Sequence, residues 1–358
     1  MTGTSLDALD AALVEIEGQG LAMRARFVRG VSHPLGELAI RLRHLAEQHP
    51  MRAYEIAALA RDFAALHEDA LRELLVTDRC DLLCVHGQTV YHAPPLSWQL
   101  MQPASLARAL GAPVVFDLRQ ADLAAGGQGA PITPLADAIL FRDVPGAWCV
   151  ANLGGYCNVT RRERTEPGIV DPARLSAADV CACNHLLDMI ARTLLHAPYD
   201  ADGAAALRGQ VHHDALVDLE GVLNAQRSAK RSLGTGDELR EWVSRFRAHV
   251  SPEDLCATAC EAIAGMIALA AADCERVILA GGGVRNLGLV RAIESASPAA
   301  VSISDGAGVP ATYREAACFA VLGALCQDRV PITLPQVTRC ASPAPIAGCW
   351  VYPPRQHS

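Results

Sequence analysis

The chain alternates between short apolar runs and longer stretches in which apolar residues recur at helical spacing. Apolar runs at residues 81–85, 112–116, 147–152 and 276–280 are typical of buried strands. Residues 38–75, which precede these runs, carry apolar residues at positions three and four apart. This spacing predicts two amphipathic helices. Short strands that alternate with helices favour an α/β protein with two sheets.

Turns built from small residues lie beside three of the predicted strands, at Gly3, Gly154 and Gly281. Glycine removes side-chain bulk, so that backbone N–H groups at such turns can approach phosphate oxygens. The sequence contains neither a P-loop nor a G-x-G-x-x-G dinucleotide fingerprint. The three turns therefore suggest a nucleotide held between two lobes by a different fold.

The amino-terminal turn differs from its counterpart in the second half. A strand at residues 147–152 leads into the Gly154 turn, whereas only Met1 and Thr2 precede Gly3. We therefore expect the first lobe to lack a central strand, which would leave an interior sheet position open and strand edges unpaired. A start site assigned too late and a truncated gene product both account for this, and we favour the former.

Length and composition narrow the class of protein. The chain has 358 residues, and roughly 100–200 residues per domain predicts two lobes, which we place at residues 1–145 and 146–358, with the last segment packing back on the first lobe. Half of the residues (51%) are hydrophobic and 20% are charged, which excludes a disordered chain. The net charge of -8 provides no basic footprint for nucleic acid.

Cysteine usage indicates a reducing, cytoplasmic setting. The thirteen cysteines are scattered, odd in number and contain no C-x-x-C pair. The sequence shows no basic segment followed by an apolar one at its amino end and no apolar run of about 18 residues. Cys181, Cys183 and His185 could bind a soft metal ion, but a fourth ligand at finger-like spacing is missing, and we predict no metal there.

Six motifs occur in a fixed order along almost the whole chain. They are Gly3-Thr4-Ser5-Leu6-Asp7, His86-Gly87-Gln88-Thr89-Val90, Asp117-x-Arg119 running to Gly126-Gly127-Gln128-Gly129-Ala130-Pro131, Asn152-x-Gly154-Gly155, Tyr199-Asp200, and Gly281-Gly282-Gly283-x-Arg285-Asn286. In this combination the chain closely resembles the anhydro-N-acetylmuramic acid kinases of bacterial cell-wall recycling. The resemblance implies a two-lobed, actin-like sugar-kinase fold, with a mixed sheet in each lobe and ATP in the cleft between them.

The resemblance also implies a reaction and its binding residues. Water opens the 1,6-anhydro ring of the amino sugar while ATP, with Mg²⁺, phosphorylates O6. The implied ATP-binding residues are Gly3, Thr4, Ser5, Leu6, Asp7, Ala8, Leu9, Asp10, Gly154, Gly155, Gly281, Gly282, Gly283 and Asn286, with Asp7 or Asp10 organising the metal. The implied sugar-binding residues are His86, Gln88, Thr89, Arg119, Asp122 and Glu315. A small amino sugar is the expected partner, without nucleic acid or membrane, and a homodimer is consistent with the family.

The implied catalytic base is Asp179, and it is followed by an unusual segment. In the family this aspartate opens an Asp-Thr-Gly-Pro-Gly-Asn loop, but residues 180–183 here are Val-Cys-Ala-Cys. Such residues do not readily adopt positive φ, so we expect the backbone to differ or the following helix to start earlier.

Further departures lie at Asp137, where the family usually has histidine, and at Thr312 and Tyr313, where it has an acidic pair. They leave two alternatives open, a sugar kinase of this fold with another substrate and a decayed nucleotide-binding paralogue.

Overall fold

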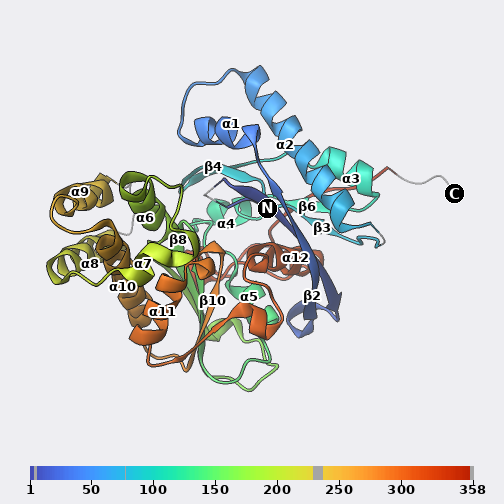
Figure 1. The fold of residues 1–358 in the computed structure, drawn as a ribbon. Coiled ribbons are helices and arrows are strands. Elements are labelled where there is room, and N and C mark those ends of the chain that lie inside the picture. The colour runs from blue at the N-terminus through green and yellow to red at the C-terminus, as the bar shows by residue number, and fades with distance from the viewer. Residues whose placement is uncertain (4–5, 77, 229–236, 355–358) are drawn as a thin grey trace. The chain divides into compact units, whose positions relative to one another are not determined.

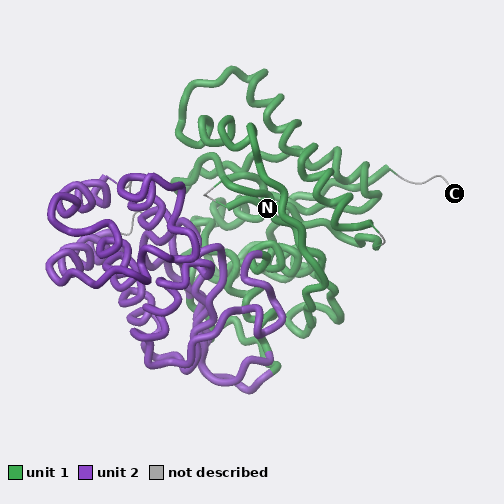
Figure 2. Tube along the Cα trace, viewed as in Figure 1, with its two compact units in different colours: residues 1–142, 168–176, 313–358 green, residues 143–167, 177–312 purple. Residues whose placement is uncertain are grey.

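The computed structural model describes residues 1–3, 6–76, 78–228 and 237–354, and Figure 1 shows its elements. The chain divides into two compact units (Figure 2). Unit 1 comprises Met1–Arg142, Gly168–Ser176 and Tyr313–Ser358, and unit 2 comprises Asp143–Pro167 and Ala177–Thr312. The chain therefore leaves the first unit and returns to it twice. The two units are therefore not separated at one point of the sequence.

Unit 2 is built on one five-stranded mixed sheet in the order β11-β10-β7-β8-β9. Its strands are β7 (Trp148–Leu153), β8 (Tyr156–Arg162), β9 (Leu175–Ala182, which begins in unit 1), β10 (Arg276–Ala280) and β11 (Ala300–Ile303). Its α-helices are α6 (Asn184–Ile190), α7 (Ala204–Arg208), α8 (His213–Ser228), α9 (Asp237–Phe246), α10 (Pro252–Ala270) and α11 (Leu287–Ala296). Central strand β7 pairs antiparallel with β8 and parallel with β10, and all six of its residues are buried. A strand enclosed in this way needs the continuous apolar run seen in the sequence.

Unit 1 contains three smaller sheets. Its strands are β1 (Ala8–Glu17), β2 (Arg24–Pro34), β3 (Leu83–Cys84), β4 (Gln88–Ala93), β5 (Leu96–Leu100), β6 (Val114–Phe116) and β12 (Cys349–Val351). Its α-helices are α1 (Glu37–Ala46), α2 (Ala53–Leu74), α3 (Ala104–Leu110), α4 (Gln120–Ala124), α5 (Pro134–Leu140), α12 (Arg314–Gln327) and α13 (Pro335–Thr338). β1 pairs with β2, β4 pairs with β5, and β12-β6-β3 form a mixed sheet. The predicted strands near residues 81 and 112 and the two predicted helices are confirmed.

The two larger sheets of unit 1 are separated by a gap. Among the described residues no strand pairs with the free edges of β1 and β3, and a cavity of about 350 Å³ lies between them. In unit 2 the corresponding place, beside β8 and β10, is filled by β7.

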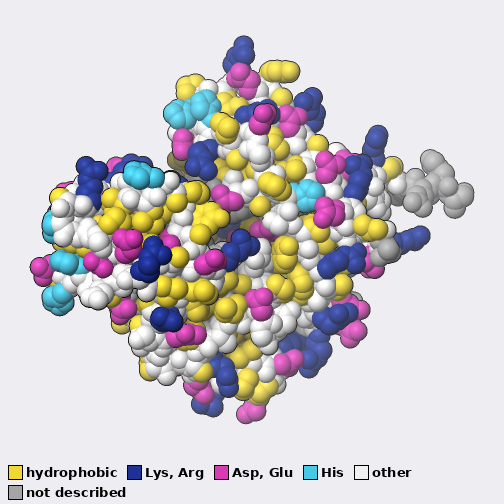
Figure 3. All heavy atoms as spheres, viewed as in Figure 1, with side chains coloured by type: hydrophobic (Ala, Val, Ile, Leu, Met, Phe, Trp, Pro, Cys, Tyr) yellow, Lys and Arg dark blue, Asp and Glu magenta, His cyan; other side chains and the backbone are white. Residues whose placement is uncertain are grey.

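On the face shown in Figure 3, acidic and basic side chains are interspersed among hydrophobic ones. No helix in the described part of the chain is long and apolar enough to cross a membrane.

Candidate active site

His86 lies in the short segment that joins β3 to β4. It is buried, and its ring packs 4.6 Å from the ring of Phe319, centroid to centroid, on α12. Arg119 donates through Nε to His86 Nε2 at 3.0 Å. Burial, followed by the nearby Arg119 charge, holds the pKa of His86 well below its ordinary value. His86 is therefore a neutral acceptor that orients Arg119.

Arg119 also organises the glycine-rich loop that follows α4. Its guanidinium donates to the Gly129 carbonyl at 2.6 Å, and the Gly129 N–H donates to Asp122 at 2.7 Å. The other carboxylate oxygen of Asp122 accepts from Thr338 Oγ1 at 2.7 Å. A side chain at Gly127 would lie 2.1 Å from the Asp122 carboxylate, so only glycine fits there.

Asp122 therefore supports the loop rather than offering a free ligand. Its side chain has no exposed surface, and both oxygens are used by partners within unit 1. Both contacts of Asp122 lie within unit 1, and its predicted contact with the sugar stays a prediction. The sequence could not identify the hydrogen bond between Thr338 and Asp122, because the two residues are 216 positions apart along the chain.

Glu315 stands in the first turn of α12, close to several charges of unit 1. Burial raises its pKa, while Arg314 and Arg119 act in the opposite direction and Asp10 adds to the rise. The structure thus brings His86, Arg119 and Glu315 together, with Asp122 behind them. Four of the six predicted sugar-binding residues form one connected group.

The other two predicted sugar-binding residues begin β4. The buried Gln88 side chain accepts a hydrogen bond from Thr2 Oγ1 and donates to the Thr89 carbonyl at 3.1 Å. Thr89 Oγ1 accepts from Gln99 on β5 at 3.4 Å. Gln88 therefore ties the amino-terminal segment to the hairpin.

The predicted phosphate turn from Gly3 to Asp10 is described only in part. Thr4 and Ser5 lie outside the described residues. Leu6 has a φ of 57°, an uncommon conformation for a side-chain-bearing residue, and β1 already begins at Ala8. Leu9 is packed in the core with 1% of its surface exposed, and its predicted place in the ATP site stays a prediction.

In unit 2 the Gly154-Gly155 turn is fixed by the start of α6. The Gly154 carbonyl accepts from the Asn184 N–H at 3.0 Å, and the Gly155 carbonyl accepts from Cys183 at 2.9 Å and His185 at 3.1 Å. A side chain at Gly155 would lie 2.5 Å from the His185 ring. The turn therefore has no room for a larger residue.

The triple-glycine turn after β10 packs against the end of β7. Gly281 has φ 84° and ψ 174°, and a Cβ there would lie 2.8 Å from Asn152 Oδ1. A Cβ at Gly283 would lie 2.6 Å from Leu153 Cβ. By contrast, nothing lies within 4 Å of a Cβ at Gly282, which is exposed. The backbone of Gly282 is therefore accessible, whereas Gly281 and Gly283 pack too closely against β7 to carry a side chain.

Asn286 closes this turn as the cap of α11. Its Oδ1 accepts from the Leu289 N–H at 3.0 Å. Asp200, in the Tyr199-Asp200 motif, accepts from the N–H groups of Ala205 and Ala206 at 2.8 and 3.0 Å, and Gly203 follows it, close to Asn286. The two motifs therefore meet, and the predicted nucleotide residues of unit 2 at 281–286 are placed together.

Alanine substitutions should distinguish the two closely packed glycines, Gly281 and Gly283, from the accessible Gly282. We expect Gly281→Ala to lower the free energy of unfolding by about 1–3 kcal/mol, because its backbone region is accessible almost only to glycine. Gly283→Ala should also destabilise unit 2, by displacing Leu153. Gly282→Ala is the matched control and should leave the unfolding midpoint in denaturant within about 0.5 kcal/mol of the parent. Equal stability of all three variants would contradict this packing.

Asp179 lies on β9, the edge strand of the unit 2 sheet, and its side chain is exposed. The segment after it does not form a loop: β9 continues to Ala182, and α6 begins at Asn184. Residues 180–183 are all buried in the core. The backbone therefore differs from a glycine-and-proline loop, as the side chains predict, and the strand is extended.

The two thiols after Asp179 are core residues. Burial raises the pKa of Cys181 to about 12, and the pKa of Cys183 is also raised, mainly by burial. A protonated thiol is a poor metal ligand. Within the described ranges no three His, Cys, Asp or Glu side chains group as a metal site would require.

A buried ion pair beneath Glu315 was not predicted. Arg314 donates to Asp137 through Nε at 2.7 Å and through a second nitrogen, and the two side chains are 2% and 0% exposed. Burial alone would lower the pKa of Arg314, but Asp137 reverses this and the pKa is raised. The sequence did contain one indication of this ion pair. Asp137 lies within the apolar segment Pro134–Leu140, and a charge buried in such a segment requires a partner.

Comparison with known proteins decides the family. The family model described as anhydro-N-acetylmuramic acid kinase matches residues 1–353. The chain belongs to this family. An anhydro-N-acetylmuramic acid kinase of Gloeobacter violaceus is 36% identical over 97% of this chain and 96% of its own length, and the one of Bordetella pertussis is 37% identical over 94% and 91%.

Membership in the anhydro-N-acetylmuramic acid kinase family confirms the predicted resemblance and the class of ATP-dependent sugar kinases. The sheets and helices of the two units confirm an α/β protein. A solved activator of 2-hydroxyisocaproyl-CoA dehydratase from Clostridium difficile, 11% identical, overlaps 88% of this chain and 94% of that chain with a TM-score of 0.44. The family assignment rests on the sequence comparisons.

Proposed function

We propose that this chain phosphorylates O6 of 1,6-anhydro-N-acetylmuramic acid while water opens the anhydro ring. The observation that carries the proposal is the family match over residues 1–353. It is supported by the connected group of His86, Arg119 and Glu315, which offers a sugar both a fixed donor and an acceptor. No observation favours another substrate.

The bonds that form and break assign a role to Asp179. Its carboxylate takes a proton from water, the water oxygen attacks C1, and the C1–O6 bond breaks. O6 then bonds to the γ-phosphorus of ATP, and ADP leaves. An exposed carboxylate on the edge strand β9 can be reached by water and sugar. Arg119 and Glu315 would hold the hydroxyl and carboxyl groups of the sugar.

The glycine turns fit a nucleotide. Because Gly281, Gly282 and Gly283 carry no side chains and Gly282 is exposed, a flat or anionic group can approach the backbone of this turn closely. Asp7 or Asp10 of unit 1 would organise Mg²⁺, which neutralises phosphate charge when bound. Because the described residues offer no larger cluster of carboxylates, that ion would keep mainly phosphate and water ligands.

The direct test is an incubation of purified protein with ATP, Mg²⁺ and anhydro-N-acetylmuramic acid. The expected result is one 6-phosphorylated sugar and one ADP for each turnover. ADP release without sugar phosphate, or with other sugars only, would contradict the proposal.

Arg119→Lys should weaken sugar binding more than turnover. The guanidinium fork holds His86 and the Gly129 carbonyl together, and a single ammonium cannot reproduce both bonds. We expect KM for the sugar to rise about tenfold, since one charge-assisted hydrogen bond contributes roughly 1.5 kcal/mol. The exposed Arg108→Lys is the matched control and should leave KM unchanged. An unaltered KM in Arg119→Lys would remove Arg119 from the site.

We further propose that the reaction takes place in the cytoplasm. All thirteen cysteines lie within the described residues and are free thiols, which is typical of a reducing compartment. The homodimer and the absence of a nucleic-acid partner stay predictions.

A further inference from the structure

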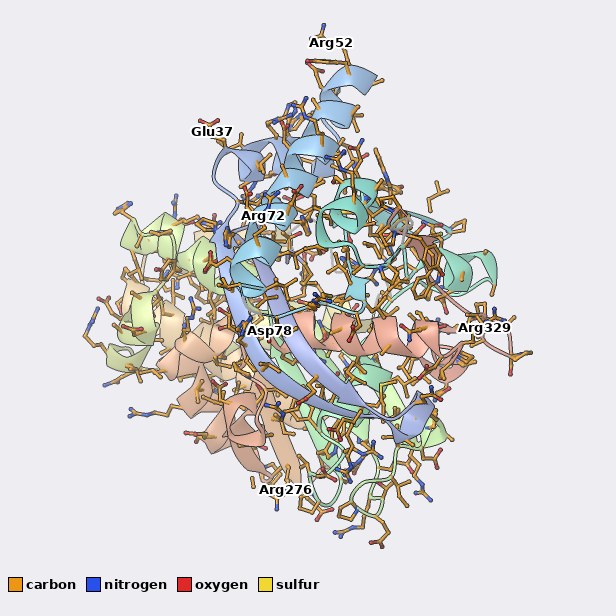
Figure 4. The ribbon with its side chains drawn as sticks, turned by 90° about the vertical axis from the view of Figure 1, so that its right-hand side faces the viewer. Glu37, Arg52, Arg72, Asp78, Arg276 and Arg329 are labelled. Carbon is orange, nitrogen blue, oxygen red and sulfur yellow. The ribbon has the colours of Figure 1, made fainter. Side chains whose placement is uncertain are left out.

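The start of helix α12 is fixed within unit 1 by several contacts. The carbonyl of Tyr313, the residue before the helix, accepts a hydrogen bond from the Ala317 N–H at 2.8 Å. The next residue, Arg314, forms the buried ion pair with Asp137 on α5. The helix also packs against β1, and in Figure 4 the long β1–β2 ribbon runs past α12, which ends near the labelled Arg329.

The Tyr313 ring packs on two residues of β2. Its centroid lies 5.7 Å from that of the Phe27 ring, and the two rings are stacked with 15° between their planes. Gly30 lies directly under the same ring, since a Cβ at Gly30 would come within 2.6 Å of Tyr313 Cγ. A side chain at position 30 would therefore collide with the ring. We call Phe27 and Gly30 the ring seat.

A β-bulge brings both residues of the ring seat to one face of β2. In the pairing of the two strands, Leu13 lies opposite Arg29 and the next residue, Val14, lies opposite Phe27. Val28 is therefore an extra residue on β2. In a regular strand, side chains three positions apart point to opposite faces. The extra residue shifts this alternation by one position, so that both residues of the ring seat meet the same ring.

Glu315 stands two residues after Tyr313, in the helix turn that begins at the ring seat. Its carboxylate interacts electrostatically with Arg314, Arg119 and Asp10. A side chain that binds substrate must be held within about 0.5 Å of its productive position. A shift of the first turn of α12 would move the Glu315 carboxylate relative to Arg119, and the contacts that fix this turn therefore bear on the site.

We propose that Tyr313 is a positioning residue for the sugar, which acts through Glu315. Its ring, held by the ring seat, fixes the first turn of α12 and thereby the Glu315 carboxylate. The inference rests on the proposed function, because it takes Glu315 as a sugar contact. It also gives a role to the departure at Tyr313 from the acidic residue of the family, since the aromatic ring fastens the helix start by packing.

The test measures kcat and KM, for the sugar and for ATP, in Tyr313→Ala and in Gly30→Ala. The first variant removes the ring and the second displaces it from β2. Both should raise KM for the sugar about tenfold, as for loss of one hydrogen bond to a charged group, while kcat and KM for ATP stay near the parent values. Tyr313→Phe keeps the ring and should restore the KM for the sugar. Tyr54→Ala, at a position of α2 that is 79% exposed, is the matched control and should change neither constant.

The double variant Gly30→Ala with Tyr313→Ala shows whether the two residues act through one contact. Without the ring, a methyl group at position 30 no longer collides with it, so the double variant should match Tyr313→Ala alone. Additive increases in KM for the sugar would overturn the proposal. A lower kcat and a lower unfolding midpoint with an unchanged KM for the sugar would also overturn it, because they indicate a merely structural role.

Failure of this inference can be told apart from failure of the proposed function. A parent protein that phosphorylates no anhydro sugar contradicts the proposed function, and the inference with it. A parent that does so, together with an unchanged KM for the sugar in both single variants, overturns the inference alone. If Tyr313→Ala does not fold, an unchanged KM in Gly30→Ala is sufficient to overturn it.

Discussion

Asp179→Asn is expected to abolish sugar phosphorylation while the fold stays intact. The amide cannot accept the proton of the attacking water, and loss of a general base costs about 10²- to 10⁴-fold in kcat. Because the Asp179 side chain is exposed on an edge strand, its replacement leaves no buried charge behind. The measurement is sugar-dependent ADP release at saturating ATP, with the unfolding midpoint recorded for the same protein.

Asp188→Asn provides the comparison for this variant. Asp188 lies on α6 of the same unit and pairs with Arg192 at 3.4 Å on the surface. Surface pairs of this kind contribute about 0–1 kcal/mol, so activity and stability should stay near those of the parent. If Asp179→Asn turns over sugar at the parent rate, Asp179 is not the base, and the extended β9 has displaced that function to another residue.

The strands and glycine turns could be predicted because each follows from a local requirement. β7 and β10 are enclosed on both sides, which demands continuous apolar residues. Gly281 and Gly155 stand where a Cβ would collide with Asn152 or His185. The apolar runs and the positive φ of Gly281 are properties of short segments, which a sequence pattern can show, whereas the partners Asn152 and His185 come from other parts of the chain.

The roles of single polar residues depended on distant partners and could not be predicted. The hydrogen bonds of the Asp122 carboxylate with Gly129 and Thr338 were not predicted. The β4–β5 hairpin was not predicted either, since its residues Gln88–Ala93 do not alternate clearly between apolar and polar. In both cases the deciding contact comes from tertiary structure, which a single sequence does not display.

Asp137→Asn should produce the largest loss of stability in the chain. The substitution leaves the Arg314 guanidinium, 2% exposed, without its anionic partner, and breaking a buried pair in this way costs about 3–5 kcal/mol. Chemical denaturation should show the loss as a lower midpoint. The double variant Asp137→Asn with Arg314→Met removes the stranded charge and should recover most of it, because apolar replacement of a whole buried pair is often neutral. Equal destabilisation in the single and double variants would show that the cost comes from packing around α5 and α12 rather than from the charge.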